Sequence, residues 1–267
     1  TTVGKSQMLF VYDVCAPVFQ SKYHNEFRES LLHGVTAPVM ISDNQIVESD
    51  DHGIFSGTEW TNFAECVISA GVHLRISDKV HGVQMTIDQL LGDDGAFALD
   101  RPLTKDKLAQ VIADVSKEFG LVANPDKQRI DSNTFVYLQR FFDRDIKIPG
   151  TNIMAGSYPA VLALNTAMNP ERFHDPDKWS GRMEILRWIM ILENAHHNPY
   201  FEDLVKIFVE GDLYGLGTKI PGYFKRGIHE DYKVAKTITG FVPSYTEAHK
   251  GRGIEDFDTY KLLKSWA

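Results

Sequence analysis

The chain has 267 residues, of which 43% are hydrophobic and 24% are charged, and its formal net charge is -8. This is a globular composition, long enough for one large or two smaller domains. The negative charge argues against a simple basic nucleic-acid coat protein, because phosphate binding depends on clustered Lys and Arg. No apolar run reaches the length of a membrane span. Cys15 and Cys66 are too few for a disulfide framework or a cysteine zinc site, so reduced thiols in a cytoplasmic setting are expected.

The first third of the chain alternates helical and extended patterns. Residues 5–32 carry apolar side chains at spacings of three and four with a break near Pro17, which predicts a bent helix or two short helices. Residues 37–47 are rich in β-forming types and predict a short hairpin. The next helix is expected to open with Thr58 as its N-cap and to end at Gly71.

An acidic segment follows that helix. Two apolar alternating runs flank Gly92-Asp93-Asp94-Gly95, the pattern of a β-hairpin whose tip carries two adjacent carboxylates. Neighbouring aspartates repel each other, so this tip is easiest to explain if a hard cation, Mg²⁺ or Mn²⁺, neutralises them. An ordinary Asp-Gly turn is the alternative that the pattern alone leaves open.

Polar residues at the start of the expected helix form a second candidate site. Thr61 and Asn62 fall off its apolar stripe, in the first turns, where free backbone N–H groups and the helix dipole favour phosphate or ribose oxygens. Gly57 permits close approach of a ligand backbone. A well-capped core helix with incidental polar residues is the alternative.

The second half of the chain shifts towards helix. Residues 104–120 predict a helix, the loop after it carries Lys127, and residues 134–142 predict one strand. From residue 157 onward helical patterns dominate. The sequence therefore predicts an α+β fold with a domain boundary near residue 151.

The order of these motifs resembles motifs B, C and D of viral RNA-dependent RNA polymerases, above all those of the picobirnaviruses, with the partitivirus group next. The segments that carry the resemblance are His52-Gly53-Ile54-Phe55-Ser56-Gly57 with Trp60-Thr61-Asn62, Gly92-Asp93-Asp94, Tyr137-Leu138-Gln139-Arg140, and Leu186-Arg187-Trp188-Ile189-Met190-Ile191-Leu192-Glu193-Asn194. It implies a right-hand polymerase: residues 1–150 form the palm, an antiparallel sheet packed on helices with motifs B to E, and residues 151–267 form a mostly helical thumb.

The resemblance also implies a chemistry. Two divalent cations would activate the attacking 3′-hydroxyl and stabilise the leaving pyrophosphate. Asp93 is the expected firm metal ligand, and Asp94 a weaker or water-mediated one. Lys127 matches the motif D lysine, a candidate general acid, although a solvent-exposed loop lysine fits equally well. The expected RNA- and nucleotide-binding residues are Ser56 and Gly57 for template or incoming nucleotide, and Thr61 and Asn62 for the ribose 2′-hydroxyl.

One element of the family pattern is missing. Motif A carries a metal-binding aspartate and a second aspartate five residues later. Asp13 does not match, because Val18 stands five residues later and Pro17 intervenes. We therefore expect the chain to begin just after motif A, as a C-terminal piece that lacks the fingers and one catalytic carboxylate and is inactive by itself.

The implied partners are RNA template and product, nucleoside triphosphates and a viral capsid protein, without a membrane. The implied locations are the virion interior and the host cytoplasm of a double-stranded RNA virus infection. Two alternatives remain: a non-catalytic RNA-binding relic, against which the intact aspartate pair argues, and a P-loop NTPase using Gly4-Lys5-Ser6. The pairs His196-His197 and His24/His33 lack a converging ligand set and are interpreted as structural.

Overall fold

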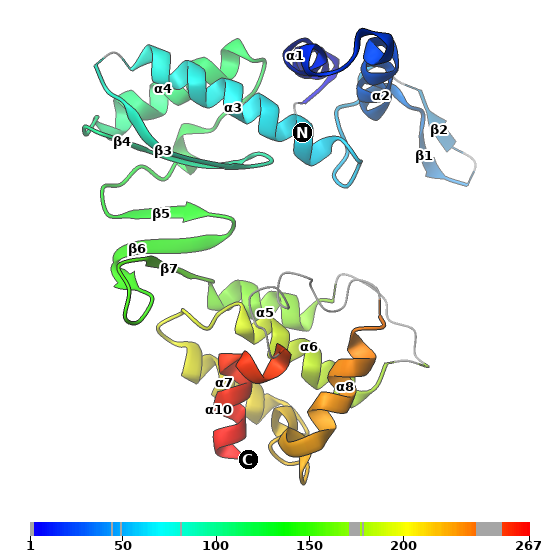
Figure 1. The fold of residues 1–267 in the computed structure, drawn as a ribbon, viewed down its shortest axis with the longest axis vertical. Coiled ribbons are helices and arrows are strands. Elements are labelled where there is room, and N and C mark those ends of the chain that lie inside the picture. Colours follow the sequence, from blue (N-terminus) through cyan, green and yellow to red (C-terminus); the bar gives the residue numbers. More distant parts are fainter. Residues whose placement is uncertain are drawn as a thin grey trace. The chain divides into compact units, whose positions relative to one another are not determined.

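The computed structural model describes residues 3–43, 45–48, 50–80, 82–170, 177, 179–238 and 253–267. The chain divides into two compact units, Thr1–Leu138 and Gln139–Ala267, and each is described by itself (Figure 1). Helices and strands occur in both units, in agreement with the predicted α+β class. The division into palm and thumb at residue 151 stays a prediction. None of the helices in the described ranges combines the length and hydrophobicity that a membrane crossing needs.

The first unit begins with two helices and a small sheet. Two short 3₁₀ turns, one of which contains Pro17, separate α1 (Lys5–Cys15) from α2 (His24–Thr36), which confirms the predicted break. The strands β1 (Val39–Ser42) and β2 (Gln45–Val47) pair antiparallel, as predicted. Asn44, which lies between these strands in the sequence, is outside the described residues.

Helix α3 (Thr61–Lys79) contacts α1, α4 (Lys105–Glu118) and β3 (Met85–Leu91) and so connects the parts of the first unit. Its N-cap is Trp60, so the predicted cap at Thr58 is wrong. The Thr58 hydroxyl instead lies 2.5 Å from the Thr61 hydroxyl. Residues 56–59 therefore form a turn before the helix rather than its first turn.

Gly71 lies inside α3 and does not end the helix, which corrects the prediction. A Cβ at this position would lie 3.0 Å from ring atoms of Phe10 and of Phe119. The glycine therefore allows helices α1 and α4 to pack closely on α3. Sequence periodicity does not distinguish a glycine that packs closely from one that terminates a helix.

This packing can be tested with two glycines that both lie in helices. We expect Gly71→Ala to lower the free energy of unfolding by about 1–2 kcal/mol, because the new methyl group overpacks the site. Gly34 in α2 has nothing within 4 Å of an added Cβ. Gly34→Ala should therefore raise stability by about 0.5–1 kcal/mol through helix propensity. Urea unfolding of both variants measures the difference, and a stabilised Gly71→Ala protein would contradict the close packing.

The acidic segment forms the predicted hairpin, with β3 (Met85–Leu91) paired antiparallel to β4 (Asp94–Leu99). Helix α4 (Lys105–Glu118) follows and packs on α3 through an apolar cluster. A 3₁₀ turn, η3 (Pro125–Lys127), and strand β5 (Thr134–Tyr137) complete the first unit.

The single strand predicted for residues 134–142 is wrong. Strand β5 ends at Tyr137, and Leu138 and Gln139 have φ angles of 49° and 59°. A left-handed conformation at two non-glycine residues interrupts the extended backbone. The sequence has no glycine or asparagine at this turn, so the β-forming pattern of residues 134–142 continues across it without a turn signal.

The second unit is mostly helical. Its strands β6 (Arg140–Lys147) and β7 (Met154–Ser157) pair antiparallel. The helices that follow are α5 (Ala160–Met168), α6 (Gly181–Glu193), α7 (Phe201–Gly211), α8 (Ile228–Ala235) and α10 (Asp258–Trp266), with short helical turns η4 (Gly215–Gly217), η5 (Tyr223–Gly227) and η6 (Gly253–Asp256).

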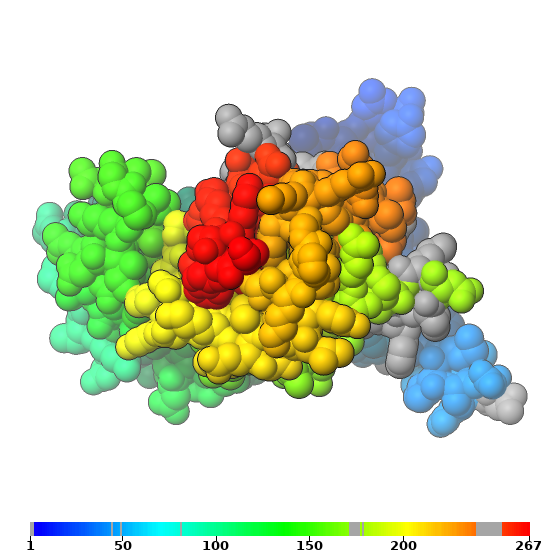
Figure 2. Space-filling model, turned by 90° about the horizontal axis from the view of Figure 1, so that it is seen from below, coloured from blue at the N-terminus to red at the C-terminus, as the bar shows by residue number. Residues whose placement is uncertain are grey.

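Helix α6 supplies the centre of this unit's core. Its apolar side chains are buried, with Ile185, Leu186, Ile189 and Leu192 at most 1% exposed. These side chains share one apolar cluster with residues of α5, α7, α8 and α10. Figure 2 looks onto this unit and shows α10, in red, between the yellow residues that include α7 and the orange residues of α8.

Candidate functional site on the acidic hairpin

The turn of the hairpin is shorter than predicted. Leu91 pairs with Asp94 across the two strands, which leaves Gly92 and Asp93 as a two-residue turn. Gly92 has a φ of 62° whereas Asp93 does not have a positive φ, the pattern of a type II′ turn. Of the two carboxylates, only Asp93 therefore lies in the turn, and Asp94 is the first residue of β4.

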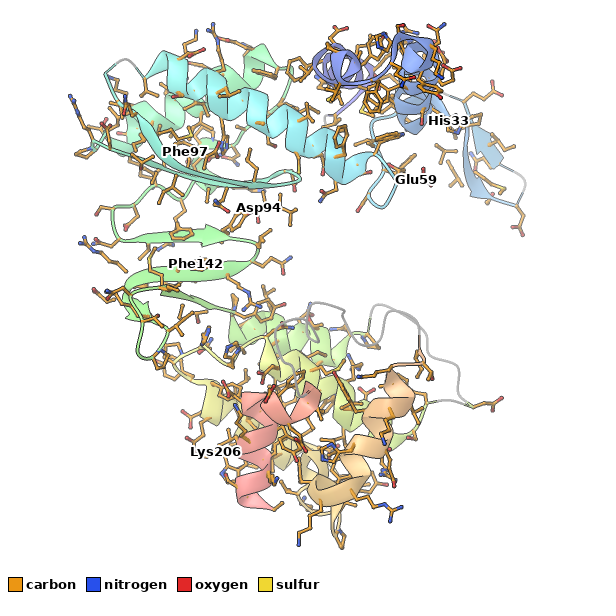
Figure 3. All side chains as sticks on the ribbon, viewed as in Figure 1. His33, Glu59, Asp94, Phe97, Phe142 and Lys206 are labelled. Carbon is orange, nitrogen blue, oxygen red and sulfur yellow. The ribbon has the colours of Figure 1, made fainter. Side chains whose placement is uncertain are left out.

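Asp93 and Asp94 differ in their surroundings. The Asp94 carboxylate accepts a hydrogen bond at 2.8 Å from the backbone N–H of Leu138, the first residue of the left-handed turn (Figure 3). Asp93 is exposed and forms no hydrogen bond with any residue that the structure describes. Asp93 is thus the more accessible of the two carboxylates, whereas the expected order of the two residues as metal ligands stays a prediction.

Polar side chains on one face of α3 hold the turn. The Cys66 Sγ accepts a hydrogen bond from the Gly92 N–H at 3.0 Å, and the Ser69 hydroxyl donates to the Gly92 carbonyl at 3.0 Å. A Cβ on Gly92 would lie 3.3 Å from Glu65 Oε2 and 3.6 Å from Asn62 Nδ2. The predicted residue Asn62 therefore lies beside the turn that carries the acidic site.

Sequence reasoning missed Glu65, Cys66 and Ser69. Residues 62, 66 and 69 recur at spacings of four and three, which places them on one helical face. This polar stripe, separate from the apolar one, is the signal that could have found them.

The remaining predicted residues occupy different positions. Ser56 and Gly57 lie exposed in the loop before α3, where Gly57 has a φ of 89°. The Thr61 hydroxyl donates to the Phe55 carbonyl at 2.7 Å and so ties this loop to the start of the helix. Lys127 is exposed in η3, and in the described part of the chain no hydrogen bond or ion pair links it to the hairpin. The structure therefore does not connect Lys127 with the acidic site.

The donor set of the hairpin suits a hard cation. Mg²⁺ is usually held by one or two carboxylates together with substrate phosphates and water. Asp93 and Asp94 provide two carboxylates on neighbouring residues. Across the described ranges, no group of three or more His, Cys, Asp or Glu side chains is arranged to hold a metal ion. The residues present therefore fit a cation that completes its shell with ligands from outside this hairpin.

Glu65 brings a further negative charge to the site. Burial raises the pKa of its carboxyl group, and the nearby Asp93 carboxylate raises it further. A carboxyl group whose pKa is higher in the folded than in the unfolded state binds its proton more tightly when folded. Its contribution to stability is present below the unfolded pKa and is lost as pH rises through the folded pKa.

We therefore expect Glu65→Gln to stabilise the protein at pH 7 by up to about 1 kcal/mol, the range for partly exposed charge pairs, and to have little effect at pH 4. Thermal unfolding at the two pH values measures this. Glu118 is the control, because Lys79 and Arg75 lower the pKa of its carboxyl group. Glu118→Gln should destabilise at pH 7. A Glu65→Gln effect independent of pH would contradict the assignment.

Comparisons with known proteins agree with the motif order. No protein-family profile matches the chain. A potential RNA-dependent RNA polymerase of human picobirnavirus (strain Human/Thailand/Hy005102/-) is 28% identical over 223 residues, which cover 80% of this chain and 40% of the relative.

Two crystal structures share the fold over 98% of this chain. The RNA-dependent RNA polymerase of a human picobirnavirus has a TM-score of 0.78 and 25% identity, with 48% of its own chain covered. Its insertion loop deletion mutant has a TM-score of 0.75 and 24% identity, with 46% covered. This chain thus spans less than half the length of these relatives. The predicted resemblance is confirmed: in sequence and in fold, this chain is similar to picobirnavirus RNA-dependent RNA polymerases.

Proposed function

We propose that this chain is part of a viral RNA-directed RNA polymerase and carries the hairpin that binds its catalytic cations. The observation that supports this most directly is the exposed Asp93 carboxylate, on a turn whose backbone is fixed to α3 beside Asn62. The similarity to picobirnavirus polymerases supports the same reaction class.

In the proposed mechanism each residue has a separate task. Asp93 and Asp94 would hold Mg²⁺ or Mn²⁺, which supplies activation of the attacking 3′-hydroxyl and stabilisation of the leaving pyrophosphate. The Asn62 amide, which can both donate and accept, recognises the ribose 2′-hydroxyl. Thr61 shares this task with Asn62, and Ser56 and Gly57 contact the template or the incoming nucleotide. Lys127 is the candidate general acid for pyrophosphate release, by the resemblance alone.

The proposal extends to the domains, the partners and the location that the resemblance to picobirnavirus polymerases implies. Residues 1–150 form most of the palm and residues 151–267 form the thumb, which the mixed first unit and the mostly helical second unit support. RNA template, RNA product and nucleoside triphosphates are the ligands, and a viral capsid protein is a further partner. Viral RNA replication and transcription then take place in the virion interior and the host cytoplasm.

The geometry at Gly4-Lys5-Ser6 speaks against the P-loop alternative. The Lys5 backbone N–H donates to Asp51 Oδ2 at 3.0 Å, at the start of α1. A carboxylate therefore already occupies the anion-binding position that a phosphate would need at this helix terminus.

RNA-templated incorporation of labelled nucleotides tests the proposal. The polymerase that carries this chain should incorporate ribonucleotides on an RNA template when Mg²⁺ or Mn²⁺ is present, and much less on DNA or with deoxynucleotides. RNA binding without any incorporation would favour the relic, whereas ATP hydrolysis without incorporation would favour the P-loop NTPase.

A further inference from the structure

The side chain of His73 connects helix α3 to both strands of the acidic hairpin. His73 is only 9% exposed, and its Nδ1 lies 2.6 Å from Asp88 Oδ1 on β3. Its ring meets the ring of Phe97 on β4 edge to face, with centroids 5.0 Å apart. Figure 3 labels Phe97 on this hairpin. One imidazole thus binds β3 by a hydrogen bond and β4 by packing.

Glycine at position 95 makes this arrangement possible. A Cβ at Gly95 would lie 2.9 Å from both Cε1 and Nε2 of His73, closer than real Cβ contacts. Asp88 pairs directly with Phe97, and Gly95 precedes Phe97 by two residues, so all three lie on the same face of the hairpin. That face is therefore shaped to receive the His73 ring.

His73 extends the row of α3 residues that holds the turn. Residue 73 follows 69 by four positions, on the same helical face as Cys66 and Ser69, which bond the Gly92 backbone. A two-stranded hairpin is only marginally stable by itself in water. The position of Asp93 relative to α3 thus depends on two attachments: the backbone bonds at the turn and the His73 contacts further along the strands.

We propose that His73, through its hydrogen bond to Asp88, is a positioning residue that fixes the metal-binding carboxylate of Asp93 relative to the nucleotide-binding start of α3. This inference rests on the proposed function. A displacement of about 1 Å of a reacting group costs on the order of 100-fold in rate. The His73–Asp88 bond is expected to act through geometry alone, because His73 contacts the strands and not the turn that holds the cation.

Three variants of the polymerase separate positioning from general stability. His73→Leu removes the hydrogen bond but keeps an apolar side chain of similar reach. His73→Asn keeps an N–H donor near the Nδ1 position. Ile68→Val, also on α3, changes a side chain buried in the cluster with α1 and α2, away from the hairpin. Ile68→Val is therefore the control that lowers the melting temperature without removing the His73 contacts.

We expect His73→Leu to lower kcat by about 10- to 100-fold, the range for small displacements, and to raise the half-saturating Mg²⁺ concentration at least about fivefold. His73→Asn should recover most of both losses. Ile68→Val should change the melting temperature but not the half-saturating Mg²⁺ concentration. If His73→Leu changes only the melting temperature, His73 is merely structural and the proposal is overturned.

Mn²⁺ binding to the polymerase without RNA or nucleotides, followed by electron paramagnetic resonance, gives a second readout that does not depend on activity. Weaker Mn²⁺ binding by His73→Leu than by the unchanged polymerase and by Ile68→Val supports the proposal. Equal binding by all three overturns it. An unchanged polymerase that binds Mn²⁺ but incorporates no nucleotide rejects the proposed function separately.

Discussion

Replacement of Asp93 by Ala should lower nucleotide incorporation by the polymerase on the order of 10²–10³-fold or more, the loss typical when one group that stabilises transition-state charge is removed. The stability of the fold should hardly change, because Asp93 is exposed in the turn. Loss of its repulsion with Glu65 should even raise the melting temperature slightly. Single-turnover incorporation at saturating Mg²⁺, with thermal unfolding of the same preparation, measures both effects.

Asp114→Asn on α4 is the matched control for this experiment. It removes one exposed carboxylate charge whose oxygen accepts a hydrogen bond from Gln110, one turn away on the same helix. Incorporation should remain near that of the unchanged enzyme. Unchanged incorporation by Asp93→Ala would remove the basis for the metal-binding hairpin.

Asp94 should behave differently from Asp93, because its carboxylate also bonds the Leu138 N–H. Asp94→Ala should lower stability by about 1–2 kcal/mol, the range for loss of a hydrogen-bond acceptor, in addition to any loss of activity. Asp94→Asn keeps an acceptor oxygen and should retain most of that stability.

Arg187→Ala is expected to destabilise the second unit by about 3 kcal/mol, since it leaves buried acceptors without their donor. Arg187 is 9% exposed, and its guanidinium donates to the Thr166 carbonyl at 3.0 Å and the Ala167 carbonyl at 2.5 Å. These carbonyls belong to the last turn of α5, where no intrahelical partner is available. The Arg187 guanidinium also forms an ion pair with the Glu184 carboxylate at 2.6 Å. Guanidinium unfolding followed by tryptophan fluorescence measures the loss.

Lys206→Ala provides the comparison for Arg187. Lys206 on α7, labelled in Figure 3, pairs with Glu202 at 3.0 Å, but its side chain is 51% exposed. Water screens such a pair, so its loss should leave the stability almost unchanged. Equal effects of the two substitutions would show that the bonds of Arg187 to α5 do not stabilise the unit.

The parts of the fold that depend on local patterns could be predicted from the sequence. Alternation around the acidic segment predicts the hairpin, and apolar spacing predicts α4 and α6. The errors arise where distant contacts decide the outcome. Gly71 continues its helix because Phe10 and Phe119 pack against it, and the turn at Leu138 has a tertiary partner in Asp94.

The residues of the candidate site also divide into those that local patterns predict and those that depend on distant contacts. Asp93 and Asn62 could be predicted, because a turn signal and a helix start are local features. The polar stripe of α3 marks Glu65 as a candidate, but the relevance of Glu65 and of His73 depends on which face of α3 the hairpin covers. A polar stripe on a helix reads as solvent-exposed until its partner element is known.

If Asp94 binds a cation as proposed, its bond to Leu138 would couple cation binding to the conformation of the left-handed turn. A cation that draws both oxygens of Asp94 towards itself would weaken the restraint on the Leu138 backbone. By linkage, a ligand whose binding tightens this restraint would reduce the affinity for the cation, and the cation would reduce the affinity for that ligand by the same factor. The conformational freedom of the backbone at Leu138, 44 residues away from Asp94 in the sequence, would thus contribute to the free energy of cation binding.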